Sequence, residues 1–230
     1  MTDLSVLVPV YNEERRGKEF LQRLVDFVDV HLKDSELLLV NDGSSDGTLD
    51  MLRTLGKGKD FVKIISYQKN RGKAFAVKEG VLAAKGSKVI FIDADGSIPP
   101  EEIPRMRQLL DKYEVVVGNR AHRESIIDQP LTRETLGRLF NLYARLLFNT
   151  RVSDHLCGFK GFRLPVARHL FSKLVSDRWV FDVELFYRIR RERFSLVDMP
   201  IRWVHKAGSK IRMFDPLKMF VQLLWLRLRV

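Results

Sequence analysis

The sequence contains little cysteine, no long apolar run and no spacing typical of a metal site. Cys157 is the single cysteine among 230 residues, which excludes an internal disulfide and a thiolate metal site. The five histidines show no metal-ligand spacing, so oxygen atoms must hold any bound metal. No run approaches the roughly 18 apolar residues that span a bilayer, and the first residues lack the basic-then-apolar start of a secretory signal. We therefore expect a cytosolic chain without a transmembrane segment.

Glycine-rich phosphate loops and interdomain linkers are also missing. Neither G-x-G-x-x-G nor G-x-x-x-x-G-K-[ST] occurs, so a glycine-rich loop is not expected to hold phosphate groups. We find no internal repeat and no Pro/Gly/Ser-rich stretch that would divide the chain. With 45% apolar residues, this favours one globular domain over residues 1–230.

Acidic side chains are scarce in the second half of the chain. Residues 1–115 hold 18 basic and 19 acidic side chains, whereas residues 116–230 hold 22 and 10. The formal net charge of +11 therefore comes entirely from the second half. Its basic residues are 17 arginines and 5 lysines, and the planar guanidinium group suits phosphate and carboxylate. This distribution implies a polyanionic partner.

Short β-branched runs alternate with stretches of helical period through the first half. Strands are predicted at 4–10, 36–41, 61–67, 88–93 and 114–117, and helices at 16–32, 48–55, 73–84 and 100–110. This repeat predicts an α/β fold with a mainly parallel sheet flanked by helices. Longer helical patterns follow at 132–150, 165–174 and 182–193, around strand-like runs at 158–162 and 195–203.

Polar residues follow each predicted strand, and in an open parallel sheet those positions meet at one edge. Asp93 and Asp95 stand one residue apart after the apolar run 89–92. Such a pair suits Mg²⁺ or Mn²⁺ that bridges a diphosphate. Helix capping and turn polarity are the other interpretation of an isolated Asp-x-Asp.

Four further positions at this edge are candidates for binding a nucleotide. Asp42 is an acceptor for a base N–H or a ribose hydroxyl, although its glycine- and serine-rich surroundings also suit an ordinary turn. Lys73 begins a predicted helix, where a phosphate can bind, or it is simply solvated. After Pro9, Tyr11 and Glu13 place an aromatic ring and an acid where a nucleobase can stack and form hydrogen bonds.

The basic half offers candidates for binding an anion. Arg120 follows the run 115–117, while Arg133 and Arg138 lie in a predicted amphipathic helix. An anionic ligand and a solvated helix face are both compatible with these arginines. In the stretch 214–230, Trp225 and flanking arginines fit a helix that lies on an anionic membrane surface, and core packing is the alternative.

The first half carries four motifs: Val8-Pro9-Val10-Tyr11-Asn12-Glu13-Glu14, Asn41-Asp42-Gly43-Ser44-Ser45-Asp46-Gly47-Thr48, Asn70-x-Gly72-Lys73 and Asp93-Ala94-Asp95-Gly96. In order and spacing, these motifs resemble those of the inverting glycosyltransferases of family 2, which have the GT-A fold. Later motifs resemble the polyprenyl-phosphate branch of that family, most closely the dolichyl-phosphate β-glucosyltransferases. They are Gly118-Asn119-Arg120, residues 154–162, residues 178–184, Met199-Pro200-Ile201-x-Trp203 and Gly208-Ser209-Lys210.

The resemblance implies roles for the candidate residues. The nucleoside would be held by Pro9, Tyr11, Glu13 and Asp42. The donor site would further include Lys73 and Asp93, and the metal site Asp93 and Asp95, with Asp95 as the principal ligand. The lipid phosphate would be held by Arg120, Arg133 and, as a third, Arg138. Together these roles make Asp95, Arg120 and Arg133 the expected catalytic set.

The resemblance also predicts the reaction. We expect transfer of a hexose from UDP-glucose to a polyprenyl or dolichyl phosphate at the cytoplasmic face of a membrane, with Mg²⁺ or Mn²⁺ as cofactor. Ser97 stands where the mannosyl branch tends to carry Gln, which disfavours the alternative donor GDP-mannose. Residues 1–117 would bind the nucleotide sugar and metal, 118–205 the acceptor, and 206–230 the membrane surface.

Two other classes of protein remain open from the residues alone. The sequence pI of about 9.9 is compatible with a nucleic-acid-binding protein, although no groove-reading motif is present and we expect no nucleic-acid partner. A sugar nucleotidyltransferase on a similar sheet would carry a glycine-rich N-terminal loop, and this chain has none.

Overall fold

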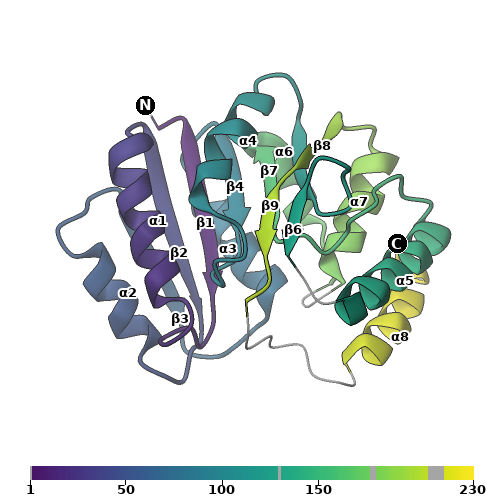
Figure 1. The fold of residues 1–230 in the computed structure, drawn as a ribbon, viewed down its shortest axis with the longest axis horizontal. Helices are drawn as coiled ribbons and strands as arrows, with labels where there is room; N and C mark the ends of the chain where they lie inside the picture. Colours follow the sequence, from purple (N-terminus) through teal and green to yellow (C-terminus); the bar gives the residue numbers. More distant parts are fainter. Residues whose placement is uncertain (1, 129–130, 177–179, 207–214) are drawn as a thin grey trace.

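The computed structural model describes residues 2–128, 131–176, 180–206 and 215–230. A seven-stranded sheet forms its centre, with the strand order β3-β2-β1-β4-β7-β5-β8 (Figure 1). Its strands are β1 (Leu4–Val10), β2 (Ser35–Asp42), β3 (Val62–Tyr67), β4 (Lys88–Ile92), β5 (Val115–Asn119), β7 (Phe159–Arg163) and β8 (Leu196–Pro200). A small second sheet pairs β6 (Ile126–Asp128) with β9 (Arg202–Val204).

Helices flank this sheet, as the alternating sequence pattern predicts. They are α1 (Lys18–His31), α2 (Thr48–Gly56), α3 (Lys73–Ala83), α4 (Ile103–Leu109), α5 (Leu131–Phe148), α6 (Leu164–Ser172), α7 (Phe181–Arg191) and α8 (Asp215–Arg227), with a 3₁₀ turn η1 (Pro100–Glu102) before α4. The α/β fold expected from the sequence is confirmed.

The sheet separates two apolar cores because alternate residues of each strand point to opposite faces. On one face, Val6 and Val8 of β1 pack with α1, α2 and α4. On the other, Leu7 packs with α3, α6 and α7. A third cluster joins α5, α7 and α8, with Phe140 and Leu223 in its centre. Part of α8 therefore belongs to the core.

The sheet is mixed rather than wholly parallel. β1 pairs in parallel with β2 and with β4, whereas β7 runs antiparallel between β4 and β5. The strand-like run expected at 158–162 is β7, but nothing in its residues shows its direction. The run 195–203 forms two strands, because β8 joins the main sheet and β9 leaves it to pair with β6. The short β6 escapes prediction from the sequence.

The outer surfaces of α5 and α8 stay apolar while their inner surfaces pack together. Met219, Leu223 and Leu226 of α8 are buried, whereas Leu224 and Trp225 are half exposed. Core packing, one of the two interpretations of the stretch 214–230, is therefore confirmed for the inner face of α8, and membrane binding by its outer face stays a prediction. Among the described residues, each helix is too short or too polar to cross a bilayer.

Gly80 lies in α3 where this helix packs against β1 and β2. A Cβ at this position would stand 1.9 Å from Cδ1 of Leu7 and 3.2 Å from Cγ2 of Val40. We expect Gly80→Ala to lower the free energy of unfolding by about 1–3 kcal/mol, because overpacking displaces buried side chains. Urea denaturation followed by circular dichroism measures this change.

Gly137 of α5 provides the control, since a Cβ there meets no heavy atom of the described residues within 4 Å. Gly137→Ala should raise the free energy of unfolding by up to about 1 kcal/mol, because alanine favours the helix interior. Equal effects of the two substitutions would contradict the packing described for α3.

Candidate functional site

The loops that follow β1, β2, β3, β4 and β5 meet at the carboxyl edge of the sheet, where the sequence predicts the site. Parallel strands bring their carboxyl ends to one side, so residues far apart in sequence come together. Described contacts join the β1 loop to the β2 loop, the β2 loop to the β3 loop, and the start of α3 to Asp93. The structure thus brings six of the candidates, listed here, to one edge: Tyr11, Glu13, Asp42, Lys73, Asp93 and Asp95.

The β1 loop presents Tyr11 and anchors Glu13. The Tyr11 side chain is 36% exposed, while Glu13 is 4% exposed. Both oxygens of the Glu13 carboxylate accept hydrogen bonds from the Arg16 guanidinium, at 2.7 and 2.9 Å. The main-chain N–H of Glu13 donates to Oγ1 of Thr48 at 2.8 Å. Glu13 therefore orders the loop on which the accessible ring of Tyr11 stands, and the half-buried Pro9 precedes that loop.

Asp42 is buried and holds the β3 loop. Its carboxylate accepts hydrogen bonds from Nδ2 of Asn70 at 2.8 Å, from the Arg71 N–H at 2.8 Å and from the Gly72 N–H at 2.9 Å. These bonds use most of the acceptor capacity of a carboxylate. Burial and the adjacent Asp42 carboxylate also raise the pKa of Tyr67. Asp42 thus fixes the β3 loop at this edge of the sheet.

Lys73 and Asp93 form an ion pair at the centre of the edge. Nζ of Lys73 lies 2.6 Å from Oδ1 of Asp93, and both side chains are partly exposed. Burial raises the pKa of Asp93, and the Asp95 and Asp182 carboxylates add to this rise against the Lys73 charge. Burial by itself would lower the pKa of the Lys73 ammonium. The Asp93, Asp182 and Asp95 carboxylates outweigh this effect, so the pKa of Lys73 is raised. Neither side chain is simply solvated.

Gly158 allows the loop before β7 to pack directly on Asp93. The Asp93 N–H donates to the carbonyl of Gly158 at 3.1 Å. A Cβ at Gly158 would lie 1.9 Å from Oδ2 of Asp93, so a side chain here would displace the carboxylate. In the sequence, Gly158 stands out only as part of the motif at 154–162, and its closeness to Asp93 appears only in the folded chain.

Asp95 lies in a tight turn after β4. Its Oδ1 accepts the Ser97 N–H at 2.9 Å, and Gly96 between them has a φ of +71°. Burial by itself would lower the pKa of Arg16. The Glu13, Asp95 and Asp93 carboxylates outweigh this effect, so the pKa of Arg16 is raised. The guanidinium of Arg16 is therefore part of the same electrostatic site, although the sequence analysis does not select it.

The oxygen donors at this edge fit a magnesium or manganese ion that is shared with a ligand. Among the described residues, His, Cys, Asp and Glu form no group of three or more that could enclose a metal ion. Mg²⁺ is commonly held by one or two carboxylates together with substrate phosphates and water. Asp95, with Asp93 two residues before it, supplies that minimal set.

Arg120 is the acceptor-side candidate that the structure describes in full. Its Nε and a terminal nitrogen donate to the Asp154 carboxylate at 2.7 and 2.8 Å, and its main-chain N–H donates at 3.0 Å. The guanidinium also lies 5.5 Å from the Trp203 ring. Burial raises the pKa of Asp154, but Arg120 and then Lys160 overcome this and lower it. Asp154 thus stays ionised and orients Arg120.

The other two arginine candidates lie in α5, but the side chains of Arg133 and Arg138 fall outside the described part of the structure. The same holds for the backbone of Gly208, Ser209 and Lys210. Glu184 is fully buried and binds the N–H groups of 175 and 176 together with Arg188. Its carboxylate is therefore engaged in structural hydrogen bonds.

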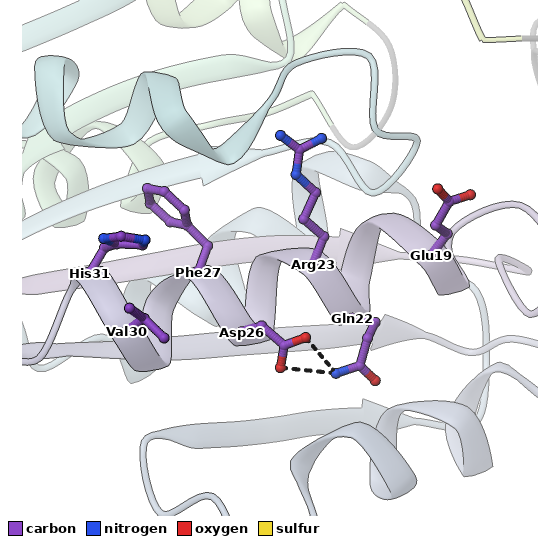
Figure 2. Close-up of a pocket in the computed structure, with 7 residues that line it drawn as sticks. All are labelled: Glu19, Gln22, Arg23, Asp26, Phe27, Val30 and His31. Atoms are coloured by element: carbon purple, nitrogen blue, oxygen red, sulfur yellow. Dashed lines mark hydrogen bonds between the residues drawn. The ribbon is translucent and has the colours of Figure 1, made fainter.

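A shallow hollow along α1 is separate from this site. Arg23 in the hollow pairs with Glu101 at 2.7 Å. Its lining residues all belong to α1, and Figure 2 shows them along the outer side of the helix: Glu19, Gln22, Arg23, Asp26, Phe27, Val30 and His31. A surface formed by one helix does not gather the loops of several strands, so we place the site at the carboxyl edge.

Comparison with known proteins gives consistent results. The model of glycosyl transferase family 2 matches residues 5–171. Dolichyl-phosphate β-glucosyltransferases of Drosophila melanogaster and Homo sapiens are each 32% identical to this chain. These matches cover 92% and 98% of this chain and 70% and 75% of the relatives.

Solved structures show the same fold. Glucosyl-3-phosphoglycerate synthase from Mycobacterium tuberculosis in complex with Mg²⁺ and UDP has a TM-score of 0.71 at 19% identity, covering 100% of this chain and 80% of that one. The complex of the same protein with Mn²⁺, UDP-glucose and phosphoglyceric acid also has a TM-score of 0.71, at 19% identity, and covers 99% and 79%. The GT-A fold expected from the sequence is confirmed.

His155 is buried in the loop before β7, next to Asp154, which binds Arg120, and this burial sets its charge state. Nδ1 lies 2.9 Å from Oδ1 of Asn141, and Nε2 lies 2.6 Å from Oγ1 of Thr150. Because the amide oxygen only accepts, Nδ1 carries the proton. Burial lowers the pKa of His155 to about 4, although the Asp154 charge opposes this and the Lys160 charge adds to it.

This burial predicts acid sensitivity. The pKa of His155 rises from about 4 to about 6.5 on unfolding, so the unfolded chain binds more protons between these values and stability falls as the pH drops. We expect this residue alone to cost about 2 kcal/mol of unfolding free energy between pH 7 and pH 5. Urea denaturation at the two pH values should show a weaker pH dependence for His155→Gln than for wild type. Equal pH dependence would contradict a neutral buried imidazole.

Proposed function

Because this chain belongs to glycosyl transferase family 2, we propose that it transfers glucose from UDP-glucose to a dolichyl or related polyprenyl phosphate. The observation that carries the proposal is the likeness to the human dolichyl-phosphate β-glucosyltransferase over 98% of this chain. That likeness extends beyond the carboxyl edge to the arginine-rich second half, where the acceptor is expected to bind. A shared fold alone would leave the acceptor open.

The donor is assigned to the edge formed by the first four parallel strands. Tyr11 offers an accessible ring for the nucleobase, on a loop ordered by Glu13, and Asp42 holds the opposite loop in place. Ser97 supports glucose over mannose, because its side chain is buried and its main chain bonds Asp95 and Val204. A serine side chain has no amide oxygen to offer a metal, in contrast to the Gln expected at this position in the mannosyl branch.

Asp95, assisted by Asp93, would hold the divalent metal. When bound, Mg²⁺ or Mn²⁺ would neutralise the charge that develops on the departing nucleoside diphosphate. Lys73 already balances one oxygen of Asp93, which leaves Asp95 as the principal ligand. The solved relatives of the same fold that hold Mg²⁺ or Mn²⁺ together with UDP support this assignment.

Arg120 would position the lipid phosphate. Asp154 occupies two of the five N–H donors of this guanidinium, so further donors can face a phosphate oxygen. A phosphate monoester is already ionised near neutral pH, and its oxygen can attack the anomeric carbon without a strong general base. Attack from the face opposite the leaving diphosphate inverts that carbon. Arg133 and Arg138 complete the proposed acceptor site.

We assign these roles to one domain with three parts. Residues 1–117 bind the nucleotide sugar and the metal, residues 118–205 the acceptor, and residues 206–230 the membrane surface. β7 from the second part pairs with β4 from the first, which supports one continuous domain. The high positive charge, which also suits a nucleic-acid-binding protein, is accounted for by a lipid phosphate and an anionic bilayer.

The exposed faces of α5 and α8 support peripheral binding to the cytoplasmic face of a membrane. Seven large apolar side chains on and just after these helices are exposed by 45–87%: Leu139, Leu142, Leu146, Val221, Leu224, Trp225 and Leu228. The Arg229 guanidinium lies 3.4 Å from the Trp225 ring. An apolar surface with aromatic and basic residues fits the interface of an anionic bilayer.

A donor panel tests the proposed reaction. We expect transfer from UDP-glucose to dolichyl phosphate with Mg²⁺ or Mn²⁺, and loss of transfer in excess chelator. Asp95→Asn should lower kcat by at least about 100-fold, because charge stabilisation in the transition state is lost. Mass spectrometry of the lipid product measures the transfer. Asp50→Asn on α2, whose side chain is 81% exposed, is the matched control.

Three results of the panel would contradict the proposal. Transfer from GDP-mannose alone would overturn the donor, and full activity in chelator would overturn the metal. Release of pyrophosphate from a nucleoside triphosphate would instead identify a nucleotidyltransferase.

Vesicle sedimentation tests the membrane surface. Leu146→Glu combined with Leu228→Glu should weaken binding to vesicles of phosphatidylcholine with anionic phosphatidylserine by at least about 10-fold, because buried apolar area is lost. Val30→Glu on α1 is the control, since Val30 is 62% exposed and lies on another helix. An equal loss in both variants, or no loss in either, would contradict docking through α5 and α8.

A further inference from the structure

Lys160 is a charged residue at the centre of the sheet. It lies on β7 opposite Phe91 of β4 and Val117 of β5, and its side chain is fully buried. Its Nζ is 5.4 Å from the rings of Phe91 and Phe186. Burying an ammonium ion in such apolar surroundings is costly unless it is paired and hydrogen-bonded.

The ammonium meets that requirement with three acceptors for its three hydrogens. Nζ donates to the carbonyl oxygen of Cys157 at 2.5 Å, to the carbonyl oxygen of His155 at 3.3 Å, and to Oδ1 of Asp182 at 2.8 Å. Buried ion pairs can often be replaced by apolar residues without loss of stability. Stability alone therefore gives no reason for a lysine at this position.

Two of these acceptors belong to residues 154–158, which we call the β7 entry loop. Its first residue, Asp154, binds the Arg120 guanidinium at 2.7 and 2.8 Å. Its last residue, Gly158, accepts the Asp93 N–H at 3.1 Å. The loop thus contacts an acceptor-side residue at one end and a donor-side residue at the other, with the ammonium bound between them.

The third acceptor, Asp182, connects Lys160 to the residues proposed to bind the sugar donor. Asp182 lies in the first turn of α7 with its side chain almost fully buried, and its charge contributes to the raised pKa of Lys73. Lys73 in turn pairs with Asp93 at 2.6 Å. Lys160 is therefore linked to Asp93 by two routes, one through the loop and one through Asp182.

We infer that Lys160 is a positioning residue whose ammonium holds the β7 entry loop so that Arg120 and Asp93 keep their separation. Only the expected loss of transfer rate rests on the proposed function; the position of the loop does not. A displacement of about 1 Å between the acceptor phosphate and the donor is enough to slow a transfer strongly. Lys160 touches neither substrate, and it acts through the residues at the two ends of the loop.

Paired apolar substitution separates positioning from stability. Lys160→Met should destabilise the protein because it leaves Asp182 buried and unpaired. Lys160→Met combined with Asp182→Leu leaves no unpaired charge, so its urea midpoint should return toward the wild-type value. Its kcat/KM for dolichyl phosphate with UDP-glucose should nevertheless stay at least 10-fold below wild type. Recovery of stability and rate together would overturn the inference.

Lys88→Met is the matched control. Lys88 begins the neighbouring strand β4 and pairs with Asp3 and Asp111 at the other end of that strand. The substitution removes an ion-paired lysine without touching the β7 entry loop. Its kcat/KM should stay within twofold of wild type, and a loss equal to that of the Lys160 variants would contradict a specific role.

A double-mutant cycle tests the route through Arg120. If Lys160 acts through that guanidinium, the kcat/KM of Arg120→Ala for dolichyl phosphate should fall less than threefold further when Lys160→Met is added. Independent roles would multiply the two losses instead. A multiplied loss would overturn the proposed route.

Hydrogen exchange gives a readout that does not depend on activity. In the Lys160→Met/Asp182→Leu variant, amides of residues 154–158 should exchange at least 10-fold faster, while those of β1 keep their wild-type rates. Unchanged exchange in the loop would overturn the inference. Absence of sugar transfer by the wild-type protein would overturn the proposed function, and the exchange result would still decide whether Lys160 holds the loop.

Discussion

Charge pairing at the carboxyl edge is the constraint that organises this molecule. Four carboxylates with little or partial exposure each have a cation within 2.8 Å, in the pairs Glu13–Arg16, Asp93–Lys73, Asp154–Arg120 and Asp182–Lys160. A carboxylate removed from water is costly unless a partner compensates its charge. Three of these pairs join different loops or elements, whereas Glu13–Arg16 closes a turn within the β1 loop. Meeting the cost of burial therefore helps to set the position of the loops.

In the part of the chain that the structure describes, no ion pair within 4.0 Å involves Asp95, which therefore departs from this pattern. Its Oδ1 accepts a main-chain N–H, and the nearby Arg16 is already bound to both oxygens of Glu13. A carboxylate in this position favours an additional cation that arrives with the ligand. This is the physical reason for proposing Asp95 as the principal metal ligand, with Asp93, which already pairs with Lys73, assisting it.

Much of the fold and part of the site follow from local sequence. The alternation of β-branched runs and helical periods predicts the parallel strands and the helices α1 to α4, because side-chain periodicity is a local property. The polar triplets after the strands predict the edge, and the position of Asp93 and Asp95 follows directly. The antiparallel insertion of β7 and the short β6 do not follow, because strand direction and pairing depend on distant partners.

The ion-pair partners of the site residues likewise depend on the tertiary structure. Arg120 finds Asp154 at a separation of 34 residues, and Lys160 finds Asp182 at 22. The chain's scarcity of cysteine and the spacing of its histidines by themselves predict that oxygen atoms bind any metal, and its uneven charge by itself predicts that the basic half meets a polyanion. Only the tertiary structure shows that Arg120 and Lys160 are the residues fixed by ion pairs. A buried charge needs an opposite charge beside it, and the partners Asp154 and Asp182 are too distant in sequence to be identified from local patterns.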